Sequence, residues 1–483
     1  MQKRQLIAAL SGAALALGMG GYLAADAYDA VPGFLTLKPA PQLPPVPTPE
    51  AWVPYQSDQT PEAAAQATPA EAPSPEQLAP ITQKLENKIK QAKGKVAIVV
   101  TDTQTGQNWI EINAKEPMIP ASTTKLYTIS TAAELLPPDG TFKTETYLSG
   151  HELYLKSNGD LLLSADKGGG NQIGTYRAAG YAGLGDLARQ TAPKLKKLGA
   201  PITLVLDDTA INGPERNGAW GAQGIQNYSG NTTDMAVLEG RTNPQKAQVF
   251  NLYPQAQALR VFADALKAEG ISIANEPDQA GPAAVPKIKI GIVPDGLAPL
   301  ASVTSDTNEN IWRFLEKTSD NTLSEQYCRI LAGPLKVVPN YEAPAQAMVN
   351  YLKQQGVNTE GVSLKDCSGL NHDNRVTAAS LTSLLNHDLK NPKLSFLPTL
   401  LPVSGWDGTL TNRMIAGQAA AGQVRAKTGS LPGVSALAGY LRTQDGHLLS
   451  FALLADNFEE GAVWEVRGAM DQFLNELSTV RKK

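Results

Sequence analysis

Three short polar strings occur in order along the 483-residue chain: Ser122-Thr-Thr-Lys125, Ser319-Asp-Asn321 and Lys427-Thr-Gly429. Together they carry the side chains that acyl transfer needs. In a helix, residues three positions apart are neighbours, so the first string places a hydroxyl beside an amine. A neutral amine can act as the base that turns a serine hydroxyl into a nucleophile. The strings therefore predict a hydrolytic site that works through a covalent acyl intermediate.

The lysine of the first string can act as a base only when it is uncharged. For this, the pKa of Lys125 must fall by about 3, which corresponds to roughly 4 kcal/mol of differential interaction. Burial and a second cation both lower the pKa of a lysine, and Lys427 is the candidate for that cation. Ser319 could then pass a proton between a lysine and the departing amine, while Asn321 hydrogen-bonds the Lys125 side chain and the substrate amide.

The third string and the residue after it have types that suit substrate binding. Lys427 and Thr428 could bind a terminal carboxylate, and Gly429 would let a substrate backbone approach the strand closely. The backbone N–H of Ser430 could form an oxyanion hole with that of Ser122. We therefore predict catalytic roles for Ser122, Lys125, Ser319 and Asn321, and substrate-binding roles for Lys427, Thr428, Gly429 and Ser430.

Each string alone is weak evidence, because a Ser-x-x-Lys match is expected about twice in a chain of this length. Indeed, residues 164–167 also match the first string and residues 229–231 match the second. Ser122 opens a helical pattern, whereas Ser164 ends an alternating stretch that predicts a strand and a turn. Taken singly, the strings could be a helix cap, a solvated lysine, a polar turn and a strand end. Their order and local context favour the catalytic interpretation.

The elements that must position these residues indicate an α/β (α+β) fold with an antiparallel sheet flanked by helices. Residues 93–101 and 109–113 predict strands ahead of the Ser122 helix, which ends before Pro137. Helical patterns at 308–314 and 323–331 flank the Ser319 turn. Further strands are predicted at 425–429, 436–442 and 448–454, followed by a closing helix over 459–477.

The first two strings are separated by 197 positions (319 − 122) although they must meet at one site. Because structureless connections of this length are uncommon, we predict an inserted domain at 150–295. The catalytic domain would then comprise residues 81–149 and 296–483. Its N-terminal boundary follows from a Pro/Ala-rich stretch over 28–80, which is too poor in apolar residues to form a core and predicts a linker.

The N-terminus predicts export. Lys3 and Arg4 precede an uncharged apolar run from Leu6 to Ala25, so that residues 1–27 are a signal peptide or a membrane anchor. The chain would lie outside the cytoplasmic membrane, in the periplasm or cell wall, and contact the membrane only through this segment. Export would permit a disulfide between the two cysteines, Cys328 and Cys367, but the sequence leaves a bridge and two free thiols equally open.

The composition excludes several other classes of protein. The hydrophobic and charged contents, 42% and 18%, are those of an ordinary globular protein, and a net charge of −4 argues against nucleic-acid binding. The four histidines have no metal-ligand spacing, so that no metal or other cofactor is predicted.

The motifs and their flanks resemble the D-alanyl-D-alanine carboxypeptidase/endopeptidase family of low-molecular-mass class C penicillin-binding proteins. The similar stretches are Pro120-Ala-Ser-Thr-Thr-Lys-Leu126, Ser319-Asp-Asn-Thr-Leu-Ser-Glu325, Leu401-Pro-Val-Ser-Gly-Trp-Asp-Gly-Thr-Leu410 with Arg413, and Gly422-Gln-Val-Arg-Ala-Lys-Thr-Gly429. The resemblance is strong over about 93–150 and 300–475, weaker through the insertion, and absent from the leader and linker. It implies a penicillin-binding-protein/β-lactamase-like transpeptidase domain with the insertion between the first and second motifs.

Two stretches depart from the pattern of that family. Where the family often has Asp-Gly-Ser-Gly-Leu-Ser-Arg, this chain reads Asp366-Cys-Ser-Gly-Leu-Asn-His372, so that the arginine is replaced by His372 and the nearest arginine is Arg375. The Gly-Asp-Pro that often follows the strand at 159–163 is also missing. Both differences concern the preference for substrate side chains and leave the acylation residues intact.

The resemblance implies a serine-type D-Ala-D-Ala carboxypeptidase, with DD-endopeptidase activity also open, that acts on peptidoglycan stem peptides through Ser122. β-Lactam antibiotics would be covalent inhibitors. Two alternatives remain from the sequence: a β-lactamase or esterase on the same scaffold, and a non-hydrolytic wall-binding protein. A binding protein has no need of a matched base, which argues against the second.

Overall fold

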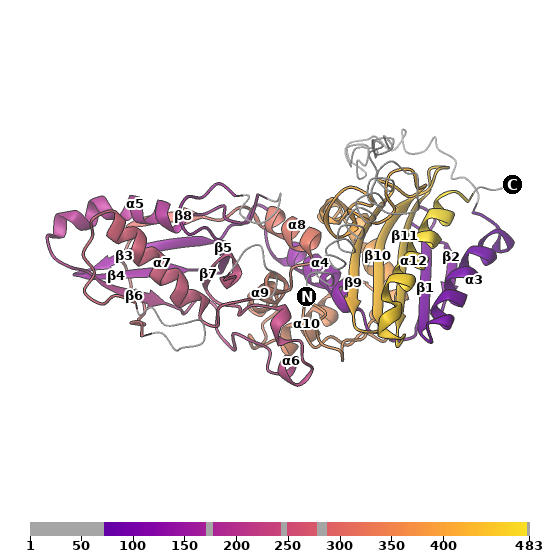
Figure 1. Cartoon of the computed structure of the whole chain (residues 1–483), viewed down its shortest axis with the longest axis horizontal. Coiled ribbons are helices and arrows are strands. Elements are labelled where there is room, and N and C mark those ends of the chain that lie inside the picture. The colour runs from indigo at the N-terminus through magenta and orange to yellow at the C-terminus, as the bar shows by residue number, and fades with distance from the viewer. Residues whose placement is uncertain (1–71, 171–176, 243–248, 278–286, 481–483) are drawn as a thin grey trace, which may run out of the picture. The chain divides into compact units, whose positions relative to one another are not determined.

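The computed structural model describes residues 72–170, 177–242, 249–277 and 287–480 (Figure 1). The predicted leader and most of the predicted linker lie outside these ranges. No helix within the described ranges combines the length and the apolar character needed to cross a bilayer. The first helix among the described residues, α3 (Pro75–Gln91), begins ahead of the predicted boundary at residue 81. Pro75 suits the first helical position, where its missing N–H costs nothing, so that a proline-rich composition hid the start of the helix.

The main sheet has five antiparallel strands in the order β2-β1-β11-β10-β9. Their bounds are β1 (Lys95–Asp102), β2 (Asn108–Ile112), β9 (Val424–Leu431), β10 (Val434–Arg442) and β11 (Leu448–Asp456). The third motif therefore lies on the edge strand β9, whose first residues pair with the segment around Val403. This arrangement confirms the predicted mixed class with an antiparallel sheet and helices.

Alternating side chains of the main sheet enter two separate hydrophobic cores. Val96, Ile98 and Val100 of β1 pack with α3 and the C-terminal helix α12 (Val463–Ser478). Ala97 and Val99 face the opposite side and join the core that contains α4 (Lys125–Leu135) and α11 (Ala378–Lys390). Figure 1 shows α3 and α12 beside the strands. The motif helix α4 is thus anchored against one face of the sheet.

Between the first and second motifs, the chain forms a second sheet in the order β6-β4-β3-β8. Its strands are β3 (Lys143–Ser149), β4 (Glu152–Ser157), β6 (Thr203–Asp207) and β8 (Ala301–Thr304), and only β4 and β6 pair in parallel. Helices α5 (Leu184–Leu195) and α7 (Pro254–Ala268) pack against each other here (Figure 1). A parallel pair, β5 (Asp160–Leu163) and β7 (Met235–Val237), completes the region.

The second sheet extends beyond the predicted insertion of 150–295 at both ends. Lys143 of β3 pairs with Thr304 of β8, so the two strands that enter and leave the region are neighbours. The predicted boundaries leave β3 in the catalytic domain, whereas its pairing partners β4 and β8 lie in the second sheet. The division into a catalytic and an inserted domain stays a prediction.

Helices α8 (Asn308–Thr318), α9 (Asn321–Leu331) and α10 (Glu342–Gln354) follow the second sheet. Ser319 and Asp320 form the turn between α8 and α9, as the two helical patterns predicted. Cys328 of α9 is joined to Cys367 by a disulfide, which settles the alternative that the sequence left open.

A substitution at Gly439 of β10 tests how closely the edge strand β9 packs against β10. A Cβ at Gly439 would lie 2.1 Å from the carbonyl oxygen of Arg425 on β9. We expect Gly439→Val to lower the free energy of unfolding by about 3 kcal/mol or more through overpacking. Thermal unfolding measures this loss. As the control, Gly468→Ala in α12 meets open space and should gain about 0.5–1 kcal/mol. Wild-type stability in Gly439→Val would contradict the close strand pairing.

Candidate active site

Ser122 lies in a 3-10 turn, η2 (Ala121–Thr124), that leads directly into α4. Ala121 has φ of +45°, in the left-handed region that non-glycine residues rarely occupy. Both neighbours of this turn are glycines: a Cβ at Gly369 would lie 1.8 Å from the Ala121 carbonyl oxygen, and one at Gly429 would lie 2.7 Å from that of Pro120. The strained turn is therefore wedged between strand β9 and the loop at Gly369, as is common at functional sites.

The Lys125 side chain is fully buried, and its amine donates three hydrogen bonds. The acceptors are Ser122 Oγ at 3.0 Å, Asn321 Oδ1 at 2.7 Å and the Ser368 carbonyl oxygen at 2.7 Å. An ammonium has three N–H donors, so every donor has a partner. The amine is thus fixed beside the hydroxyl of the first string by groups from two other parts of the chain.

Asn321 begins α9, and the amide group of its side chain is oriented from both ends. Its oxygen accepts from Lys125, and its Nδ2 donates to the Tyr228 carbonyl oxygen at 2.9 Å. The neighbouring Asp320 receives Arg241 Nη2 at 3.0 Å, and the same guanidinium reaches Glu239 at 2.8 Å. Segments between the first two motifs therefore hold the second motif in place.

Ser319 and Lys427 form the second hydroxyl–amine pair of the site. Ser319 ends α8 with φ of +59°, and its Oγ receives a hydrogen bond from Lys427 Nζ at 2.8 Å. The Lys427 amine also donates to the Thr428 carbonyl oxygen at 2.9 Å and is fully buried. The five predicted groups Ser122, Lys125, Ser319, Asn321 and Lys427 thus lie in two directly bonded sets.

Burial lowers the pKa of both lysines, because an ammonium loses its hydration in the interior. The pKa of Lys125 falls to about 8 and that of Lys427 to about 7, and the proximity of Lys125 contributes to the fall at Lys427. The sequence analysis expected burial and a second cation to lower the Lys125 pKa. Burial does lower it, whereas nearby carboxylates, Glu325 foremost, act to raise it. Burial therefore gives each amine a larger uncharged population near neutral pH than an exposed lysine has.

Glu316 of α8 is a charged neighbour of both lysines that the sequence analysis missed. Its side chain is 1% exposed, and neither carboxyl oxygen has a hydrogen-bond partner among the described residues. Burial raises the pKa of Glu316 to about 7, while Lys427 and Lys125 act to lower it. A cavity of about 20 Å³ beside Glu316 is lined by Leu126, Ser130, Asp388 and Tyr440, among others, and is large enough for one water.

The remaining predicted residues lie on β9 with partners of their own. Thr428 Oγ1 donates to Thr409 Oγ1 at 2.9 Å, and Ser430 Oγ donates to the Gly429 carbonyl oxygen at 2.8 Å. Arg467 of α12 donates to Ser430 Oγ. These side chains lie on the part of β9 that follows Lys427, and none of these side-chain hydrogen bonds joins the two sets above.

The second copies of the motifs have local structural partners. Ser164 forms a bridge with Gly183 next to β5, and the Asn231 amide donates to the Leu252 carbonyl oxygen. The departure at His372 is also local: Arg375 donates to the carbonyl oxygens of His372 and Asn374. These contacts agree with the choice of the first copies as the site.

Three contributors to the site carried little or no sequence signal. Ser368 and Tyr228 act through backbone oxygens, which every residue type has. Glu316 lies three residues before Ser319, and the apolar pattern of its helix could have drawn attention to a carboxyl on the buried face.

Known proteins resemble this chain in sequence and in fold. Residues 77–248 and 233–477 match the model of the D-Ala-D-Ala carboxypeptidase 3 (S13) family. The chain is 33% identical over 371 residues to carboxypeptidase DacB of Mycolicibacterium smegmatis, covering 74% of this chain and 75% of that protein. It is 27% identical over 441 residues to a D-alanyl-D-alanine carboxypeptidase of an Actinomadura species, covering 77% and 80%. Penicillin binding protein 4 from Haemophilus influenzae shares the fold, with a TM-score of 0.63 and 20% identity over 83% of this chain and 99% of that one.

The charge balance of the site predicts how Lys125 titrates. We expect its amine to lose its proton near pH 8, as followed by NMR of labelled lysines with Lys125→Arg as the assignment control. Glu316→Gln removes the carboxylate that favours the ammonium form of both lysines, so the Lys125 pKa should fall further. A Lys125 pKa near 10.4, the ordinary lysine value, would contradict the burial argument.

Proposed function

Because the chain belongs to the D-Ala-D-Ala carboxypeptidase 3 (S13) family, we propose that Ser122 is the nucleophile of a serine-type D-Ala-D-Ala carboxypeptidase that acts on peptidoglycan stem peptides. The observation that carries the proposal is the 3.0 Å contact between Lys125 Nζ and Ser122 Oγ. In the neutral amine, the two N–H groups donate to Asn321 and Ser368, so that the lone pair faces the Ser122 hydroxyl. Such an amine is held in the place from which it can remove the hydroxyl proton.

In acylation, neutral Lys125 takes the proton of Ser122 as Oγ attacks the carbonyl carbon of the penultimate D-Ala. The backbone N–H groups of Ser122 and Ser430 stabilise the oxyanion. Ser319, bonded to Lys427, passes a proton to the departing amine of the terminal D-Ala. Water then attacks the ester and gives a proton to the Ser319–Lys427 pair, which replaces the proton passed to the amine. The Lys125 ammonium returns its proton to Ser122, so that the net reaction is hydrolysis of one peptide bond.

Substrate binding is assigned to the edge strand β9. Lys427 and Thr428 would bind the terminal carboxylate, and Gly429 would admit the substrate backbone beside the strand. A β-lactam carries an acyl group and a carboxylate of similar spacing and would acylate Ser122. The penicillin binding protein 4 of Haemophilus influenzae, which shares the fold, has been solved in complex with a β-lactam. Peptidoglycan as substrate places the protein in the periplasm or cell wall, and the N-terminal segment would be its signal peptide or anchor.

Labelled penicillin tests the assignment of the base. We expect Ser122→Ala to abolish labelling and Lys125→Ala to slow acylation by about 100- to 10,000-fold, the range for loss of a general base. Lys84→Ala, at an exposed ion pair with Glu476, serves as the matched control and should label at the wild-type rate. Normal acylation in Lys125→Ala would remove this residue from the mechanism.

The same labelling experiment separates the alternative functions. Stable labelling of Ser122, together with release of D-Ala from purified wall peptides detected by mass spectrometry, fits the peptidase. Rapid turnover of the label without cleavage of wall peptides would indicate a β-lactamase, and absence of labelling would indicate a binding protein.

The pH dependence of acylation follows from the two lysines. Lys125 must be neutral and Lys427 charged, so the rate should rise as Lys125 loses its proton and fall as Lys427 does. With pKa values of about 8 and about 7, the maximum should lie between pH 7 and 8. Lys427→Arg keeps its charge at high pH and should lose the falling limb at a lower maximal rate. A falling limb that persists in Lys427→Arg would assign it to another group.

A further inference from the structure

The third acceptor of the Lys125 amine comes from a loop that none of the three motifs contains. The Ser368 carbonyl oxygen lies 2.7 Å from Lys125 Nζ, on the segment Asp366–Gly369. This segment also borders the strained turn of the nucleophile, because a Cβ at Gly369 would lie 1.8 Å from the Ala121 carbonyl oxygen. Any shift of the loop therefore alters both the base and the turn that carries Ser122.

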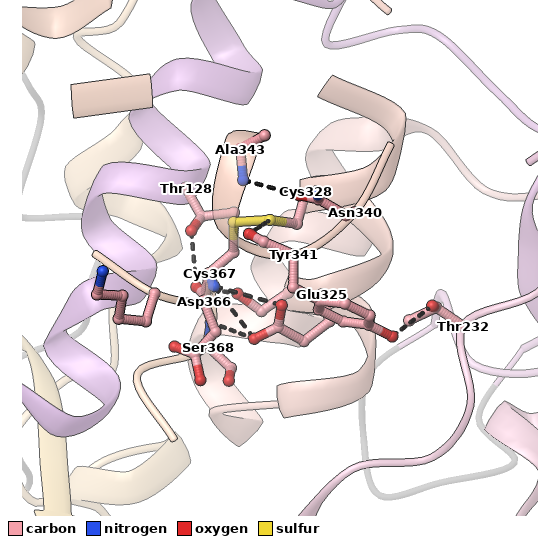
Figure 2. Close-up of a disulfide and its surroundings, with 12 residues drawn as sticks. Thr128, Thr232, Glu325, Cys328, Asn340, Tyr341, Ala343, Asp366, Cys367 and Ser368 are labelled. Carbon is pink, nitrogen blue, oxygen red and sulfur yellow. Dashed lines mark hydrogen bonds between the residues drawn. A yellow bond between two sulfur atoms is a disulfide. The ribbon is translucent and has the colours of Figure 1, made fainter. Parts of the chain in front are cut away.

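Side chains from α4 and α9, the helices that follow the first two motifs, form hydrogen bonds with the backbone of the loop (Figure 2). The Cys367 carbonyl oxygen accepts from Thr128 of α4 and Ser324 of α9, each at 2.7 Å. The Glu325 carboxyl group accepts the backbone N–H of Cys367 at 3.2 Å and that of Ser368 at 2.7 Å. The loop is thus fastened at the two residues that determine where the Ser368 carbonyl points.

The disulfide adds a covalent connection at the same place. Cys328 lies on α9, whose first residue is Asn321, and its sulfur bonds Cys367, the residue immediately before Ser368. Both cysteines are fully buried. Figure 2 shows the disulfide and the Glu325 carboxyl group beside the Cys367–Ser368 backbone. One bond therefore joins the helix that carries Asn321 to the loop that carries Ser368.

We propose that the Cys328–Cys367 disulfide is a positioning element for Lys125, because it covalently fixes the two segments that supply its Asn321 and Ser368 acceptors. This inference rests on the proposed role of Lys125 as the base. Without the bond, the loop is held by hydrogen bonds alone, and water can replace the Ser368 carbonyl at the amine. A disulfide forms in oxidising compartments, so the chain acquires its full acylating power only after export.

The test is the pH profile of acylation in a Cys328→Ala/Cys367→Ala double variant. Hydration of the Lys125 amine reverses the burial that lowers its pKa, so the rising limb should move to higher pH by about one unit. Acylation by labelled penicillin at pH 7 should then be about tenfold slower. The oxidised wild-type protein is the reference, and labelling of its Ser122, lost in Ser122→Ala, is measured first. Failure of that labelling would overturn the proposed function rather than the role of the disulfide.

A matched control separates positioning from general loss of stability. Leu474 is buried in α12 within the core on the other face of the main sheet, away from the loop. Leu474→Ala should lower the melting temperature but keep the wild-type pH profile, measured well below that temperature. Two results would overturn the proposal: a double variant with a lower melting temperature and an unchanged profile, or a Leu474→Ala profile shifted as far as that of the double variant.

Discussion

The burial of one amine is the constraint that organises this site. An ammonium in a dry interior is costly unless each of its donors meets an acceptor. Lys125 meets this condition only because Ser122 precedes it by one turn, Asn321 begins α9, and Ser368 lies on a separate loop. Three stretches far apart in the sequence must therefore converge within hydrogen-bond reach, and the sheet, the helices around it and the disulfide are the means of that convergence.

The same burial creates an electrostatic problem that Glu316 relieves. Two lysines in one interior region repel each other when both are charged, and Lys427 would then lose its proton too easily to bind a carboxylate. The Glu316 carboxyl favours the charged form of both amines, while its own pKa is raised to about 7. Three groups with pKa values near 7 to 8 can exchange charge at little cost, which suits chemistry that moves one proton in each direction.

The sequence indicated the family and the fold class, but it did not point to Glu316 or to the backbone groups around Lys125. The family resemblance drawn from the three strings and the mixed α/β class were confirmed by the matches over residues 77–248 and 233–477 and by the observed sheets. The acceptors on Ser368 and Tyr228 could not be predicted, because a backbone oxygen leaves no trace in residue type. The disulfide stayed open because two cysteines 39 residues apart approach each other only through the packing of α9 against the 366–369 loop.

The large insertion raises the question of what such a long connection does for the site. Closing a loop costs free energy that grows only with the logarithm of its length. A loop that becomes four times longer therefore costs only about 1.2 kcal/mol more to close. The segments between the first two motifs make several contacts with the second motif. Gly230 N donates to Thr322 Oγ1 at 2.9 Å, the Tyr228 carbonyl orients the Asn321 amide, and Arg241 bridges Asp320 and the buried Glu239. Three contacts on the consecutive residues 320–322 fix the orientation of the start of α9 as well as its position. The amide of Asn321 can serve Lys125 only in the orientation that they impose.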